Sequence, residues 1–184
     1  MNRKGRLLRI GAIVACTWVC LAHAQQIRFT DITEAKAVKG YLVNGVSVYG
    51  HGVAMADITG DGLPEIYVSQ AVEDSVPCPE VLYISKAGAA FTEEASRRGL
   101  RDSCGIGSHG SVFFDLDNDN DWDVYNGNTT ARNRLYRNRG NGYFDDITVS
   151  AGLRDWAYGT RGVVAFDANN DGYMDLYCVG AQVG

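Results

Sequence analysis

Apolar positions along this chain come in short runs of four to seven residues, separated by glycine, asparagine and aspartate. The runs are rich in Val, Ile, Tyr and Phe, which favour strands, and the residues between them favour turns. The helical signal is weak, and the segment EEASRRGL predicts one turn at most. In the clearest stretch the runs are 52–57 (GVAMAD), 65–70 (EIYVSQ), 81–86 (VLYISK) and 90–95 (AFTEEA). The pattern predicts an all-β fold with four strands in this stretch.

The same pattern recurs along the chain. DITGDGLPEIYVSQ begins at Asp57, DLDNDNDWDVYNGN at Asp115 and DANNDGYMDLYCVG at Asp167, so the copies start 58 and 52 residues apart. A glycine precedes the apolar run before each copy, and Phe29, Phe91 and Phe144 each stand nine residues before a Val or Leu. Four strands in a unit of about 53 residues indicate a blade of a β-propeller.

Each copy contains an acidic loop with the same spacing of oxygen-bearing side chains. They occupy positions 1, 3, 5 and 9, and position 6 is Gly or Asn, which accept a positive φ most easily. Two ionised carboxylates about 4 Å apart repel by roughly 4 kcal/mol at an effective dielectric constant near 20, so the loops need a compensating charge. Hard oxygen donors at this spacing favour Ca²⁺, with up to three ions in all. The predicted ligands are Asp57, Thr59, Asp61 and Glu65; Asp115, Asp117, Asp119 and Asp123; and Asp167, Asn169, Asp171 and Asp175.

Two other interpretations of the acidic loops are an EF-hand and simple turns without an ion. An EF-hand shares the first half of the pattern but requires Glu at position 12 and flanking helices, whereas position 12 here is Val68, Asn126 or Cys178. Alternatively, Asp and Asn simply form good turns, although three copies in register favour an ion. The copies differ, because Thr59 supplies a neutral oxygen and Asn120 replaces glycine in the second loop, whereas the third loop matches the pattern cleanly.

The N-terminal segment changes the picture of charge and compartment. Basic residues, an apolar stretch and the sequence AHA at 22–24 predict a signal peptide over residues 1–24, with 25–184 as the exported domain. Four of the 17 basic residues and none of the 22 acidic ones lie in that segment, so the remainder carries a net charge of −9. This charge argues against nucleic acid as a partner. In an oxidising compartment Cys78 and Cys104 could pair, but sequence leaves the connectivity open, and Cys178 is expected to be buried.

The loops and their flanks resemble the FG-GAP/VCBS repeat, the blade of integrin-α-like β-propellers. FTDIT, GHGVAMADITGDGLPEIYV and LYRNRGNGYFDDITVSAGL resemble most closely the propeller part of ASPIC/UnbV (cartilage acidic protein-like) proteins. The resemblance covers nearly all of residues 27–184. It implies a calcium-stabilised propeller that serves adhesion or extracellular interaction, with calcium ligation carried to the twelve positions above.

The sequence therefore predicts a partial, about three-blade propeller, a fragment of a larger closed one. The expected function is non-enzymatic interaction with a protein or glycan, in a secreted, extracellular or periplasmic setting without a membrane span after signal cleavage. One alternative is part of a propeller enzyme that uses His51 and His109, which both stand six residues before a loop aspartate. Another is a purely structural acidic β-repeat. Trp122, Tyr125, Trp156 and Tyr158 are expected mainly to pack within blades.

Overall fold

The computed structural model describes residues 31–32, 35–36, 42–43, 46–47, 49–71, 80–100, 108–129, 131–153 and 159–181. The chain divides into two units, Met1–Ile32 and Thr33–Gly184, and the fold below concerns the second. Within the described residues no helix is long and apolar enough to cross a membrane. The predicted signal peptide, Phe29, Cys78, Cys104, Trp156 and Tyr158 lie outside the described residues.

The described fold is all-β, and its two largest sheets are four-stranded antiparallel meanders. The four strands predicted for each of the first two repeats are therefore confirmed, and the helical segment is a single 3₁₀ turn, η1 (Ser96–Arg98). The first sheet has the order β3 (Tyr49–Ala56), β4 (Glu65–Ala71), β5 (Val81–Ile84), β6 (Thr92–Glu93). The second has the order β7 (Ser108–Phe114), β8 (Asp123–Asn128), β9 (Arg134–Asn138), β10 (Phe144–Asp146).

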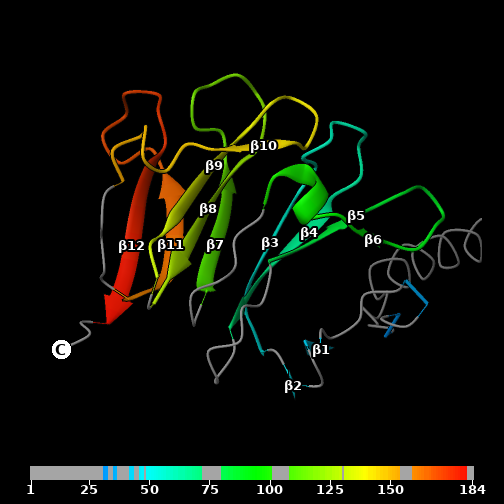
Figure 1. The fold of residues 1–184 in the computed structure, drawn as a ribbon. Coiled ribbons are helices and arrows are strands. Elements are labelled where there is room, and N and C mark those ends of the chain that lie inside the picture. Colours follow the sequence, from blue (N-terminus) through cyan, green and yellow to red (C-terminus); the bar gives the residue numbers. More distant parts are fainter. Residues whose placement is uncertain are drawn as a thin grey trace, which may run out of the picture. The chain divides into compact units, whose positions relative to one another are not determined.

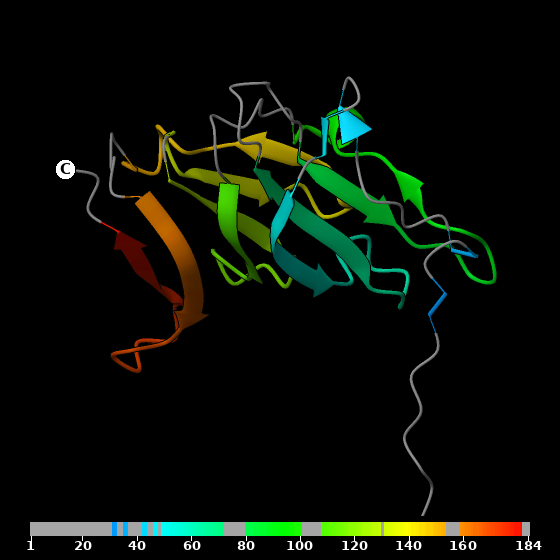
Figure 2. The ribbon, with the colours of Figure 1, turned by 90° about the horizontal axis from the view of Figure 1, so that it is seen from below.

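The third repeat contributes the antiparallel pair β11 (Gly159–Phe166) and β12 (Asp175–Ala181), and a small hairpin joins β1 (Leu42–Val43) to β2 (Val46–Ser47). The three main sheets follow one another in chain order, with β7 in contact with both β3 and β11 (Figure 1, Figure 2). The first strand of each sheet thus contacts the first strand of its neighbour, and the second strands take part as well, since β4 contacts β7 and β8 contacts β11.

Two hydrophobic clusters fill the spaces between successive sheets. The cluster between the first and second sheets includes Tyr67, Phe113 and Val124, and the Tyr67 and Phe113 rings meet edge to face with their centroids 6.0 Å apart. The cluster between the second and third sheets includes Phe114 and Tyr125. The successive residues Phe113 and Phe114 of β7 therefore pack on opposite faces of the sheet, because side chains along a strand alternate between its two faces.

Candidate metal site in the acidic hairpin loops

The three acidic loops are the β3–β4, β7–β8 and β11–β12 hairpin connections, and they share one backbone conformation. Two residues in each loop adopt a positive φ, at positions 4 and 6 of the repeat pattern. These residues are Gly60 (76°) and Gly62 (85°), Asn118 (61°) and Asn120 (67°), and Asn170 (61°) and Gly172 (87°). Gly and Asn occupy these positions because they tolerate the left-handed region best. Asn120 therefore adopts in the second loop the positive φ that Gly62 and Gly172 adopt in the other two.

The aspartate at position 1 holds each loop together by accepting backbone N–H groups. In the first loop, Asp57 Oδ1 accepts the N–H groups of Gly60 at 2.8 Å and Asp61 at 3.1 Å, and its Oδ2 accepts that of Gly62 at 2.7 Å. Asp115 and Asp167 accept the N–H groups of positions 5 and 6 in the same way. The hydrogen bond from Gly172 is the main cause that lowers the pKa of Asp167.

The acidic residue at position 9 anchors each loop at its base. Asp123 is fully buried, and its Oδ2 accepts the N–H of Leu116 at 2.8 Å while its Oδ1 accepts that of Asn138 at 2.8 Å. Burial raises the pKa of Asp123 to about 6, against the opposing effect of these two hydrogen bonds. Glu65 is likewise fully buried and accepts hydrogen bonds from the Ile58 N–H and the Ser85 hydroxyl, both at 2.9 Å.

Position 3 differs from positions 1, 5 and 9, because in the first two loops its side-chain oxygens accept no hydrogen bond from the described residues. Asp117 accepts no hydrogen bond from the described residues, and Thr59 Oγ1 is a buried atom without a hydrogen-bond partner among them. In the third loop the Asn169 amide bonds to Asp171, through both Oδ1 and Nδ2. Position 3 therefore offers free oxygens where the first and second loops could meet a ligand.

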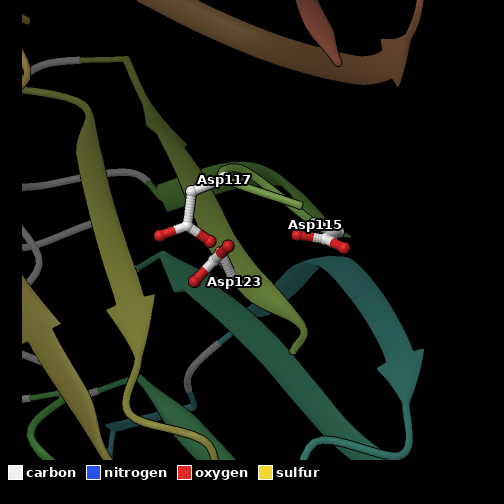
Figure 3. A group of neighbouring side chains, drawn as sticks. All are labelled: Asp115, Asp117 and Asp123. Carbon is white, nitrogen blue, oxygen red and sulfur yellow. The ribbon is translucent and has the colours of Figure 1, made fainter. Parts of the chain in front are cut away.

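The second loop brings three carboxylates together. One oxygen from each of Asp115, Asp117 and Asp123 lies within 4.8 Å of the other two, which is a spacing that could hold a metal ion. Figure 3 shows the carboxylates of Asp117 and Asp123 next to one another, with Asp115 to one side. The fit to a hard cation rests on the donor set, which is made of carboxylate oxygens only.

The other predicted ligands are placed on equivalent loop positions without forming such a group. Among the described residues, the three-carboxylate grouping occurs in the second loop only. Asp61, Asp119 and Asp171 each accept the backbone N–H two residues further on, and Asp175 accepts the N–H of Ala168 at 3.0 Å. The difference follows from position 3, which carries a carboxylate in the second loop alone.

The second and third acidic loops lie in a segment that matches a known repeat family. Residues 115–178, which run from the second acidic loop into β12, match the family model described as an FG-GAP-like repeat. The chain contains an FG-GAP-like repeat. The family resemblance inferred from the loop and flank sequences is confirmed.

Curated relatives of this FG-GAP-like chain are cartilage acidic proteins. Cartilage acidic protein 1 of Mus musculus is 32% identical over 136 residues, and those of Homo sapiens and Xenopus tropicalis are 30% and 28% identical over 134 and 135 residues. Each match covers 69% of this chain and 20% of the relative. The chain therefore spans about a fifth of the length of the curated relatives it matches.

Asn138 is a site residue of the FG-GAP-like repeat that the sequence reasoning missed. Its Oδ1 accepts the N–H groups of Gly140, Asn141 and Gly142, and its Nδ2 donates to the carbonyl of Ile58 in the first acidic loop at 3.0 Å. Because Asn138 also binds Asp123 through its own N–H, it connects the first loop to the second. The signal was present, since Asn138 and Ser85 both stand three residues after the leucine of the repeated Leu-Tyr pair.

Two further predictions have different outcomes. Tyr125 is buried, as expected for packing within the repeat, while Trp122 is exposed. The prediction that Cys178 is buried is wrong, because Cys178 is exposed. It lies on β12, which in the described residues is the outer strand of a two-stranded sheet, so no third strand covers it.

Proposed function

We propose that this chain is an exported calcium-binding β-propeller repeat module that acts through non-enzymatic interaction with proteins or glycans outside the cytoplasm. The observation that carries the proposal is the group formed by Asp115, Asp117 and Asp123, within an FG-GAP-like repeat. Oxygen-only donor sets favour Ca²⁺ over zinc or copper. The ion offsets the repulsion among the loop carboxylates and fixes the hairpin that joins β7 to β8.

The propeller part of the proposal is supported by how the sheets repeat. Each four-stranded meander starts with the strand that contacts its neighbour, and the contact between β3 and β7 is followed by an equivalent one between β7 and β11. A blade in a propeller meets its neighbours in this way. We infer that the described repeats belong to a larger closed propeller, in line with the relatives being several times longer than this chain.

The interaction part of the proposal is supported by charge and family. The predicted exported domain carries a net charge of −9, and the relatives are named for cartilage and for acidity. The proposal assigns no catalytic step to the acidic loops. Their carboxylates hold the loop backbone through hydrogen bonds and, in the second loop, use the remaining oxygens for the ion.

Calcium binding is tested by calorimetric titration of the chelator-treated protein with CaCl₂. D117N removes a charge that takes no part in the loop's hydrogen bonds, so the fold is retained while one binding step weakens by about tenfold or more. At a hundredfold excess over the dissociation constant, a bound ion stabilises the folded state by about 2.7 kcal/mol, so chelation lowers the Tm of the wild type more than that of D117N.

The matched control is D121N, which removes the same charge from the same loop outside the Asp115–Asp117–Asp123 group. Its titration should resemble that of the wild type. If D117N and D121N lose affinity equally, the effect is one of general charge and the site is not the one proposed. If the wild type shows neither heat of binding nor a change in Tm, the loops are hydrogen-bonded turns without an ion.

A further inference from the structure

The histidines at equivalent positions of the first two repeats meet at the interface between sheets. His51 on β3 and His109 on β7 each occupy a register irregularity of the strand pairing, between Gly50 and Gly52 and between Ser108 and Gly110. His51 Nδ1 lies 3.3 Å from His109 Nε2, and the two ring centroids are 4.1 Å apart with planes inclined by 35°. The pair stands at the opposite end of β3 and β7 from the acidic loops.

The separation of the two ring nitrogens suits a shared metal ion. Zinc binds imidazole nitrogen at roughly 2.0–2.1 Å, so two nitrogens at a tetrahedral angle lie about 3.3–3.4 Å apart. We propose that His51 and His109 form a second metal site, selective for a divalent transition metal such as Zn²⁺ and distinct from the oxygen-only loops. Nitrogen donors suit Zn²⁺ and Cu²⁺, whereas oxygen donors suit Ca²⁺.

The surroundings of His109 favour its neutral imidazole, the form that binds metal. Burial, then the charges of His51 and Arg161, lower the pKa of His109. Arg161 occupies the equivalent bulge on β11, and the Ser69 hydroxyl on β4 donates to the His109 carbonyl. His51 is exposed beside an open depression of about 230 Å³, which leaves room for the water ligands that complete the coordination shell.

The test is calorimetric titration with ZnCl₂ in the presence of saturating CaCl₂, so that the acidic loops do not compete. H51A and H109A should each weaken Zn²⁺ binding by about tenfold or more, because each leaves a single imidazole. D121N is the matched control, because Asp121 lies outside both proposed sites, and it should leave Zn²⁺ binding unchanged. Circular dichroism and the Tm of each variant establish that the fold is retained.

Two further variants test the proposal by a gain of Zn²⁺ affinity, in addition to the loss expected for H51A and H109A. R161H places a third imidazole at the equivalent repeat position, where it should tighten Zn²⁺ binding, and R161Q should do so less by removing a positive charge. The proposal is overturned if H51A and H109A bind Zn²⁺ as the wild type does. It is also overturned if the pair binds inorganic phosphate more tightly at about pH 6 than at about pH 7.5 while Zn²⁺ does not bind, since charged imidazoles then form an anion site.

Discussion

At the scale of single residues, like charges coexist in the acidic loops because most of them have backbone partners. Asp115 accepts the N–H groups of Asp119 and Asn120, while Asp119 accepts that of Asp121. Hydrogen bonds from N–H groups favour the ionised carboxylate. Asp117 accepts none of these hydrogen bonds, and its carboxylate lies in the group with Asp115 and Asp123, which is the reason that we place the ion there.

A second charged residue with a structural role is Arg98, which joins the first repeat to the second. Arg98 is 9% exposed, and its Nε donates to Glu94 Oε2 at 2.9 Å. Its Nη1 donates to the carbonyls of Asn141 and Gly142, both at 3.1 Å, and the guanidinium lies over the Tyr143 ring at 4.9 Å. Partial burial raises the pKa of Glu94, but the hydrogen bond and charge of Arg98 outweigh it, and the net pKa is lowered.

This pair predicts a pH-dependent stability. Because the folded-state pKa of Glu94 lies below its ordinary value of 4.5, the ionised form stabilises the fold above that pH and the effect is lost as pH falls through the folded-state pKa. E94Q should therefore lower the free energy of unfolding by about 1 kcal/mol near neutral pH, with a difference that shrinks below pH 4.5. Urea unfolding across this pH range measures it.

The control for E94Q is D145N, which alters an exposed ion pair with Arg139. Exposed pairs contribute little to stability, so D145N should unfold like the wild type at every pH. A constant difference between E94Q and the wild type down to pH values well below 4.5 would mean that lost packing, and not charge, causes the effect.

At the scale of elements, glycine determines how closely neighbouring sheets approach. A Cβ on Gly52 would lie 2.3 Å from the His109 carbonyl oxygen and 2.5 Å from Ser69 Oγ. A Cβ on Gly110 would lie 3.0 Å from the Gly162 Cα. The glycines before the first two apolar runs, visible in the sequence as a repeat landmark, are therefore needed where one strand passes against the backbone of the next sheet.

The close approach at Gly52 predicts a large effect of a single methyl group. G52A should lower the free energy of unfolding by about 2 kcal/mol or more, since the contacted atom is a backbone oxygen that cannot move without shifting β7. G162A is the matched control, because a Cβ there meets nothing within 4 Å, and it should change stability by no more than about 0.5 kcal/mol. Chemical denaturation of both variants decides this, and equal effects would contradict the close-packing explanation.

At the scale of the whole molecule, one face of the β11–β12 sheet is exposed, whereas the equivalent residues of the first two sheets are buried. Tyr67 and Tyr125 are 0% and 3% exposed between successive sheets, while Tyr177 at the same repeat position on β12 is 62% exposed. Val164, Phe166 and Val179 are exposed beside it. Contiguous apolar surface of this kind favours association.

In the proposed closed propeller a further blade covers this face, so residues 25–184 expressed alone are expected to self-associate through it. Y177K should shift the protein toward the monomer in sedimentation velocity, because it places a charge in the middle of the apolar face. V149K is the control, since Val149 is 61% exposed in a turn that is not part of the β11–β12 sheet and should leave association unchanged. A wild-type protein that stays monomeric at all concentrations would contradict the prediction.

The sequence by itself determined the all-β class, the repeat and the place of each acidic loop. These features are local, because a few neighbouring residues determine the strand and turn preferences and the spacing of the aspartates. The inference that Asn120 sits where glycine turns the chain also followed from local preference. Nine of the twelve predicted ligand positions lie in the three hairpin loops, and the other three, Glu65, Asp123 and Asp175, begin the strands that follow them. The first two repeats form the expected four-stranded sheets.

Only the tertiary structure decided what each loop residue does. In the first two loops the residue at position 9 is buried, and its partners are Ser85, just after β5, and Asn138, at the end of β9. These partners lie 20 and 15 residues further along the chain. The meeting of His51 with His109 and the exposure of Cys178 likewise depend on which strands lie next to one another. Such contacts join residues that are distant in sequence, so the hydrophobic pattern of one strand or turn does not determine them, although the repeat spacing marked His51 and His109 as equivalent positions.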